Sequence, residues 1–103
     1  MGRIYNIQAT RGRDYAFTVR FPYDITGYTF FGEYRETQDQ ETATGTFAVT
    51  PDELTNEVRF HMTNSQTTAL ETGTYYFETW EVSPASFKRT IVEGKVYVRN
   101  GGK

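Results

Sequence analysis

Apolar and polar residues alternate one by one along several short segments of the chain. The clearest case is residues 14–21, which place four large apolar side chains at every second position: Tyr15, Phe17, Val19 and Phe21. Successive side chains of a β-strand point to opposite faces of the sheet, so this period of two predicts a half-buried strand. The same period recurs in residues 28–36, 58–62 and 74–82. A chain patterned in this way buries its apolar residues by forming sheets, and we predict an all-β fold.

Residues that favour turns separate these segments. Pro22 ends a strand because it has no N–H to donate, and Asp24 is predicted to accept a hydrogen bond from the backbone two residues further on. The polar residues 38–44 are predicted to be a mobile hairpin tip, and residues 51–56 a turn. The predicted strands cover residues 3–9, 14–21, 28–36, 46–50, 58–62, 74–82, 87–91 and 92–98, with a bulge or bend at Gly94. Short strands at this spacing predict an antiparallel, Ig-like β-sandwich of roughly seven to nine strands.

One segment carries the signals of a helix instead. Thr63 is a favourable N-cap, and Gln66 stands three residues later, which is the spacing of a capping box. Gly73 is placed to end the helix. The sequence therefore predicts one short helical crossover between strands, near residues 63–71.

Length, cysteine content and charge narrow the class of protein. The 103 residues suffice for one domain, predicted as a single Ig-like β-sandwich over residues 1–99 with a flexible C-terminal tail over residues 100–103. The absence of cysteine excludes disulfides, thiolate metal sites and cysteine nucleophiles. No apolar run approaches the roughly 20 residues that span a bilayer, and the N-terminus lacks the apolar core of a signal peptide, so we expect no membrane contact. The net charge is −2 and the basic residues are scattered, so we expect no nucleic-acid binding.

Few residues are candidates for chemistry. His61 is the only histidine, and its place in an alternating strand favours a solvent-facing side chain over a catalytic triad or a zinc ligand. Glu33 and Glu78 on adjacent strands could in principle form the acid pair of a glycosidase, but both fall at outward polar positions. Asp39 and Glu41 lack the spacing of a calcium loop. We therefore predict no catalytic residue, no metal site and no cofactor, and a protein that is not an enzyme.

Aromatic residues are the unusual part of the composition, at 17%. Four of them are predicted on outward strand faces and form the candidate interaction surface: Phe31, Tyr76, Trp80 and Tyr97. Three interpretations remain open at this point. The rings belong to the core if the register is misjudged by one residue, they contact a protein partner, or they stack on carbohydrate or nucleic-acid bases.

Four motifs occur in a fixed order along nearly the whole chain. They are Gly12 and Asp14 with Phe17, the run Asp-Ile-Thr-Gly-Tyr-Thr at residues 24–29, the segment of residues 62–78, and the run Val-Glu-Gly-Lys-Val-Tyr-Val at residues 92–98. In this order of motifs the chain resembles the small Ig-like domains of tailed-bacteriophage structural proteins, including those at the N-terminus of upper baseplate proteins. It departs from their pattern at the Pro84-Ala85-Ser86 turn, where Gly-Asp is commoner, and in the aromatic strand around Trp80.

The resemblance implies a non-enzymatic structural protein of the virion, in the tail, baseplate or neck. Its expected partners are other virion structural proteins, met in multiple copies, and its expected location is the virion, assembled in the host cytoplasm. A capsid decoration protein of the same fold is an alternative that the sequence does not separate from the tail interpretation. An alternative from another class is a carbohydrate-binding module whose platform would be Tyr76, Trp80 and Tyr97.

Overall fold

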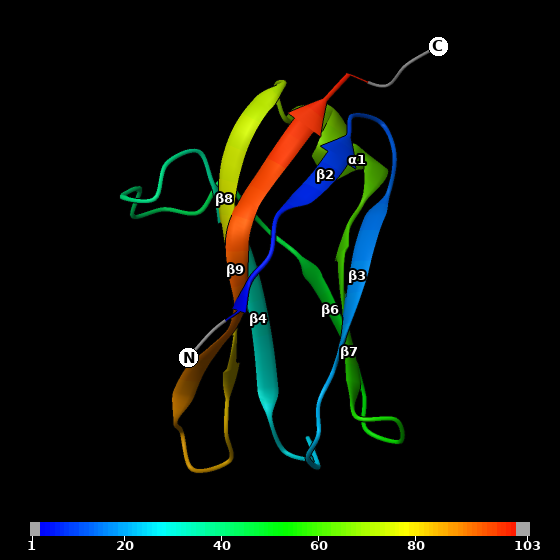
Figure 1. Ribbon diagram of the computed structural model, residues 1–103, viewed down its shortest axis with the longest axis vertical. Helices are drawn as coiled ribbons and strands as arrows, with labels where there is room; N and C mark the ends of the chain where they lie inside the picture. The colour runs from blue at the N-terminus through cyan, green and yellow to red at the C-terminus, as the bar shows by residue number, and fades with distance from the viewer. Residues whose placement is uncertain (1–2, 101–103) are drawn as a thin grey trace.

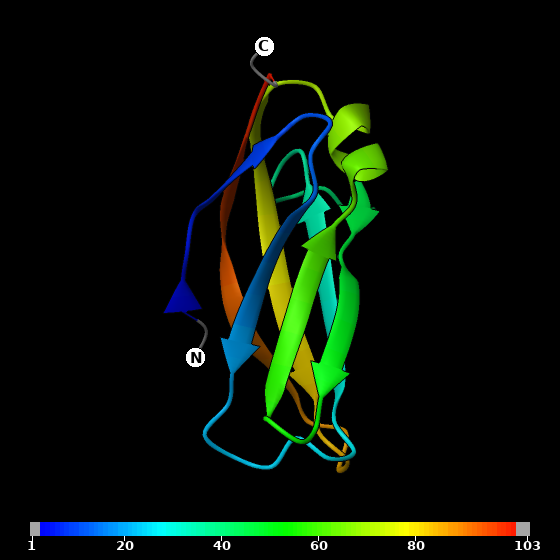
Figure 2. The ribbon, with the colours of Figure 1, turned by 90° about the vertical axis from the view of Figure 1, so that its right-hand side faces the viewer.

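The computed structural model describes residues 3–100 and has two β-sheets packed face to face (Figures 1 and 2). The large sheet has the strand order β1-β9-β8-β4-β5, with β2 also paired to β9, and the small sheet has the order β3-β7-β6. The strands of the large sheet are β1 (Arg3–Ile4), β2 (Ile7–Thr10), β4 (Thr29–Arg35), β5 (Gly45–Thr46), β8 (Gly73–Val82) and β9 (Lys88–Arg99). Those of the small sheet are β3 (Tyr15–Arg20), β6 (Ala48–Asp52) and β7 (Glu57–Met62).

This architecture confirms the predicted all-β sandwich, and the nine strands fall within the predicted range. The prediction of a purely antiparallel fold is wrong in one respect, because β1 and β2 both run parallel to β9. The loop between β4 and β5, which contains the predicted hairpin tip at residues 38–44, projects from the side of the sandwich (Figure 1). The helix of the described part, α1 (Asn64–Ala69), is too short to cross a membrane.

A cluster of four phenylalanine rings joins the two sheets. Phe17 of β3 packs on Phe60 of β7, with their ring centroids 5.2 Å apart. The Phe17 ring also meets Phe77 of the large sheet edge-on, with centroids 5.9 Å apart. Phe47 lies among them, with centroid distances of 6.0 Å to Phe77 and 6.4 Å to Phe60. Aromatic pairs in such stacked and edge-on contacts contribute beyond the area they bury, so this cluster is the centre of the core.

The predicted strand at residues 46–50 is two strands in two different sheets. Its first part, β5, pairs with β4 in the large sheet, and its second part, β6, pairs with β7 in the small sheet. Phe47 is the residue between them, and its N–H donates to the carbonyl of Gly32 at 2.9 Å. The chain therefore changes sheets at Phe47, which carries this ring, 4% exposed, into the interior.

The predicted strands at residues 87–91 and 92–98 are one continuous strand, β9, with an irregularity in its pairing to β8. The pairing shifts by one residue between Thr79 and Trp80, so Ile91 has no residue opposite it. Beside this irregularity the Thr79 hydroxyl donates to the Val92 carbonyl at 3.0 Å and accepts from the Val92 N–H at 3.1 Å.

The bulge predicted at Gly94 is therefore displaced to Ile91. Gly94 has a different role, because a Cβ at this position would collide with the backbone carbonyl of Tyr5. The close approach belongs to the N-terminal segment, where the single strand predicted over residues 3–9 is interrupted at residues 5–6. There the side chain of Asn6 accepts from the Lys95 N–H at 3.1 Å in place of a backbone carbonyl.

The helical crossover is confirmed, and its capping box is formed. The Thr63 side chain accepts from the Gln66 N–H at 3.2 Å, and the Gln66 side chain accepts from the Thr63 N–H at 2.9 Å. The predicted end at Gly73 is wrong, because the helix is capped at Leu70 by extended backbone and Gly73 begins β8. The turn is shorter than the predicted residues 51–56, because β6 extends through Asp52.

We expect Thr79→Val to lower the free energy of unfolding by about 2 kcal/mol, because it removes two hydrogen bonds to the buried backbone of Val92. Thr50→Val, at an exposed position of β6, is the matched control and should change stability by less than about 0.5 kcal/mol. Urea denaturation of both variants measures the difference. Equal stability of the two variants would contradict the role assigned to the Thr79 hydroxyl.

Candidate functional site: the outer face of the large sheet

The large sheet turns one face to the core and the other to solvent. Along β4 and β8 the buried side chains alternate with the outward ones, so Phe31 and Trp80 fall on the outer face. The pairing register places these two residues directly opposite each other on adjacent strands. The sheet therefore orders its outward side chains into rows that run across β4, β8 and β9.

The first row is aromatic. The rings of Phe31 and Trp80 stack with centroids 5.4 Å apart and an angle of 18° between their planes. The ammonium group of Lys88 lies 4.6 Å from the centroid of the Trp80 ring. Since β8 lies between β4 and β9, these two contacts reach the indole from opposite sides. Both flat faces of Trp80 are therefore in contact with another side chain of the row.

The next two rows carry opposite charges. Glu33, Glu78 and Glu93 lie opposite one another across three strands. Glu33 forms an ion pair of 2.7 Å with Arg35, and the Thr90 hydroxyl donates to Glu78 at 2.8 Å.

The basic row lies one step further along the strands. It consists of Arg35, Tyr76 and Lys95, which the register also places opposite one another. A hollow of about 550 Å³ opens over these two charged rows, and its lining includes Tyr76, Glu93, Lys95 and Ile4. Ile4 is 70% exposed, so the hollow has an apolar rim on the side of β1.

The four aromatic residues predicted to point outward all lie on this face. Phe31 and Tyr97 are exposed, with 40% and 38% of their surface accessible, and Tyr76 and Trp80 are half-buried. None of the four belongs to the buried core. The structure brings Phe31 and Trp80 together, whereas Tyr76 stands in the basic row and Tyr97 lies beyond it, opposite Thr74.

The residues considered for chemistry are placed differently from one another. The prediction that His61 faces solvent is wrong. Its side chain is half-buried, and its Nε2 lies buried 3.8 Å from a carboxylate oxygen of Asp14. Glu33 and Glu78 are direct neighbours on one flat face and do not oppose each other across a cleft. Among residues 3–100 no group of three or more histidine, aspartate and glutamate side chains is arranged to hold a metal ion.

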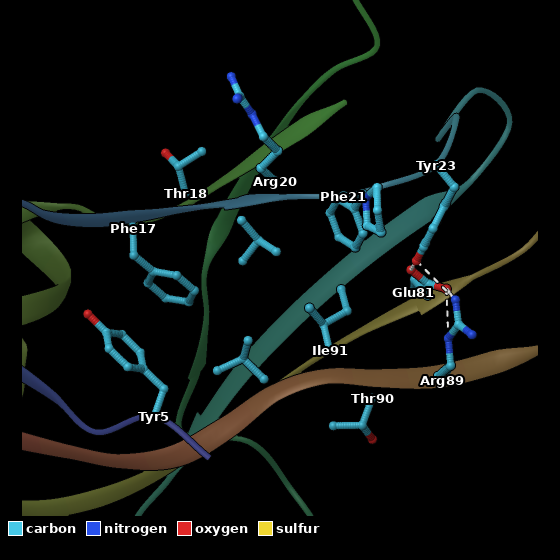
Figure 3. Close-up of a pocket in the computed structure, with 13 residues that line it drawn as sticks. Tyr5, Phe17, Thr18, Arg20, Phe21, Tyr23, Glu81, Arg89, Thr90 and Ile91 are labelled. Carbon is cyan, nitrogen blue, oxygen red and sulfur yellow. Dashed lines mark hydrogen bonds and ion pairs between the residues drawn. The ribbon is translucent and has the colours of Figure 1, made fainter. Parts of the chain in front are cut away.

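A second feature, on the side of the sandwich between β3 and β9, was not predicted (Figure 3). Glu81 is only 2% exposed and accepts a hydrogen bond of 2.6 Å from the Tyr23 hydroxyl. Arg89 forms an ion pair of 2.7 Å with the same carboxylate and donates to the Tyr23 oxygen at 3.0 Å. A buried carboxylate is costly unless it is paired, and here both partners come from other parts of the chain. Glu81 stands four residues after the buried Phe77 of β8, and an even spacing puts both side chains on the same face of the strand. This spacing is the signal that could have placed Glu81 inside.

Comparisons with known proteins bear on the fold. No protein-family model matches the chain, and no curated protein matches it. Among solved structures, an internalin-like protein of Listeria monocytogenes is similar, with a TM-score of 0.52 and 14% sequence identity. The similarity covers 95% of this chain but only 28% of that protein. At this level of identity the similarity supports the sandwich fold and carries no function.

The hydrogen-bonded group of Tyr23, Glu81 and Arg89 makes the free energy of unfolding depend on pH in the alkaline range. Burial, followed by the hydrogen bond to Glu81, raises the pKa of Tyr23 from 10.0 to about 12. The folded state thus keeps a proton that the unfolded state loses, so this contribution to stability is complete below pH 10.0 and is lost as the pH rises towards about 12. We expect the free energy of unfolding of Tyr23→Phe to fall less steeply over this window than that of the unchanged chain. Denaturation at a series of pH values measures it, and parallel pH profiles would contradict it.

Proposed function

We propose that the chain is a non-enzymatic structural module of a bacteriophage virion, in the tail, baseplate or neck. In this proposal it binds neighbouring virion proteins, in multiple copies, through the outer face of the large sheet. The order of motifs from Gly12 to Val98 supports the kind of protein, and the exposed aromatic row supports the mode of action. The proposed location is the virion, assembled in the host cytoplasm.

The stacked pair of Phe31 and Trp80 is the observation that carries the mode of action. Aromatic residues are enriched at protein interfaces, and tryptophan dominates the residues whose truncation weakens binding most. The pair is held in one geometry by the sheet and by Lys88, so a partner that covers it loses little side-chain entropy on binding. The acidic and basic rows beside it offer charge contacts that select a partner and fix its orientation.

The alternative of a carbohydrate-binding module receives less support. Sugar rings stack on an open aromatic face, whereas Trp80 has Phe31 on one side and Lys88 on the other. A sugar would have to displace one of these contacts before it could stack. The alternative of a capsid decoration protein would use the same outer face, and the position of the chain in the particle separates it from the tail interpretation.

The acidic residues also support a role without catalysis. A glycosidase needs two facing carboxyl groups, one of which is kept protonated by an apolar environment. Glu33 is engaged by Arg35 and Glu78 by the Thr90 hydroxyl, and both stand on an open face. We therefore propose these carboxylates as contact residues.

We expect Phe31→Ser to reduce incorporation of the chain into particles of the phage that encodes it by about tenfold, the effect of losing one central interface aromatic. Leu54→Ser is the matched control, because Leu54 is also an exposed apolar residue, 96% accessible, but lies in the turn between β6 and β7. Quantitative mass spectrometry of purified particles measures the copies retained, and circular dichroism checks that both variants fold. Equal incorporation of the two variants would contradict the assignment of this face, and particles that lack the unchanged chain would contradict the virion assignment.

A further inference from the structure

The edges of the two sheets are not equally protected against pairing with another strand. On the small sheet, β6 carries Pro51, which has no N–H to offer a partner. On the large sheet, β5 is only two residues long, and the β1–β2 edge is interrupted at residues 5–6. The β3 edge differs, because its six residues run without proline, glycine or a bulge.

The outward backbone groups of β3 can be identified from one hydrogen bond. The N–H of Phe21 donates at 2.8 Å to the carbonyl of Asn56, the residue directly before β7. The backbone groups of Phe21 therefore point towards the β7 side of the strand. Backbone groups alternate along a strand, so those of Ala16, Thr18 and Arg20 point away from β7. Within residues 3–100, β3 pairs only with β7, and no backbone hydrogen bond uses these outward groups.

A groove lined by apolar side chains at one end and by the Tyr23, Glu81 and Arg89 group at the other runs beside this edge. It has a volume of about 530 Å³ and lies between β3 and β9, with Phe17 reaching into it from β3 and Ile91 from β9 (Figure 3). Tyr5 reaches over from the N-terminal segment, and its ring centroid is 6.1 Å from that of Phe17. The free edge and the groove therefore form one surface, with free backbone groups on its rim and the side chains of Phe17 and Ile91 beside them.

We infer that this surface binds a second copy of the chain, by antiparallel pairing of the two β3 strands about a two-fold axis at Thr18. Thr18 is the middle one of the three residues whose backbone groups face outward, so an axis there pairs all three of them with those of the other copy. Ala16 of each copy then lies opposite Arg20 of the other, and the three outward residues exchange about six hydrogen bonds across the axis. The two small sheets become one continuous sheet.

The side chains of β3 fit this register. The Arg20 side chain meets Ala16, so no like charges lie opposite each other, whereas a two-fold axis at Arg20 would oppose two guanidinium groups. On the inner side Phe17 lies opposite Val19 of the other copy, an aromatic and β-branched pair that stabilises adjacent strands. The same pairing brings the two grooves to the same side of the joined sheet. The strand of an unrelated protein would satisfy the outward backbone groups, but it has no comparable reason to match this side-chain pattern.

This dimer leaves the outer face of the large sheet uncovered, so it is independent of the proposed function. The two-fold axis lies at the edge of the small sheet, and the aromatic row of Phe31 and Trp80 lies on the opposite layer. Pairing through β3 would present two copies of that row on one assembly. A partner that displays repeated sites would then bind with avidity.

Disulfide trapping tests the inference, because the chain contains no cysteine. Residues in a hydrogen-bonded antiparallel pair have Cα atoms about 5.5 Å apart, which a disulfide can bridge. Under mild oxidation, most of the Thr18→Cys chain should become a covalent dimer. Ala16→Cys and Arg20→Cys should each give no covalent dimer alone and should form one when mixed. Thr50→Cys, exposed on β6, is the control that should not be trapped.

Sedimentation velocity of the full chain provides the second measurement. The unchanged chain should dimerise with rising concentration, and Thr18→Lys should lose the dimer because two lysines would lie opposite each other at the axis. Thr50→Lys should keep it. A chain that stays monomeric up to its solubility limit, or Thr18→Cys trapped no more than Thr50→Cys, would overturn the inference and leave the edge to a strand of another protein.

Discussion

Four phenylalanine rings between the two sheets hold the rest of the structure in place. They come from strands of both sheets and from the crossing at Phe47, and each lies within 6.4 Å of others in the cluster. Because side chains alternate along a strand, burying Phe77 of β8 also decides what faces out. Trp80 lies on the outer face and Glu81 on the inner one because the strand is fixed by this cluster. The exposed aromatic row and the buried carboxylate are thus two consequences of the same packing.

Alternation along single strands was enough to predict much of the fold and the faces. The inner and outer residues of β4 and β8, including Phe31 and Trp80, follow directly from a period of two. Local signals also predicted the capping box of α1 and the turn at Asp24, whose side chain accepts from the Thr26 N–H at 3.0 Å. In these cases the deciding contacts lie within a few residues of one another.

The features that sequence reasoning missed depend on contacts between distant segments. Nothing near Phe47 says that the chain changes sheets there, because that depends on the partners offered by β4 and β7. The irregularity of β9 at Ile91 follows from its pairing with β8, where the hydroxyl of Thr79 bonds the backbone of Val92. The burial of Glu81 required Tyr23 and Arg89, which lie 58 and 8 residues away along the chain.

We propose that the protein makes its contacts through the outer face of the large sheet. The most direct test is an electron cryomicroscopy map of the particle produced by the phage that encodes the chain. The account predicts a copy of this sandwich in the tail, baseplate or neck, with a neighbouring subunit packed on Phe31 and Trp80. A map in which that face is bare to solvent while other surfaces hold the chain in place would contradict it.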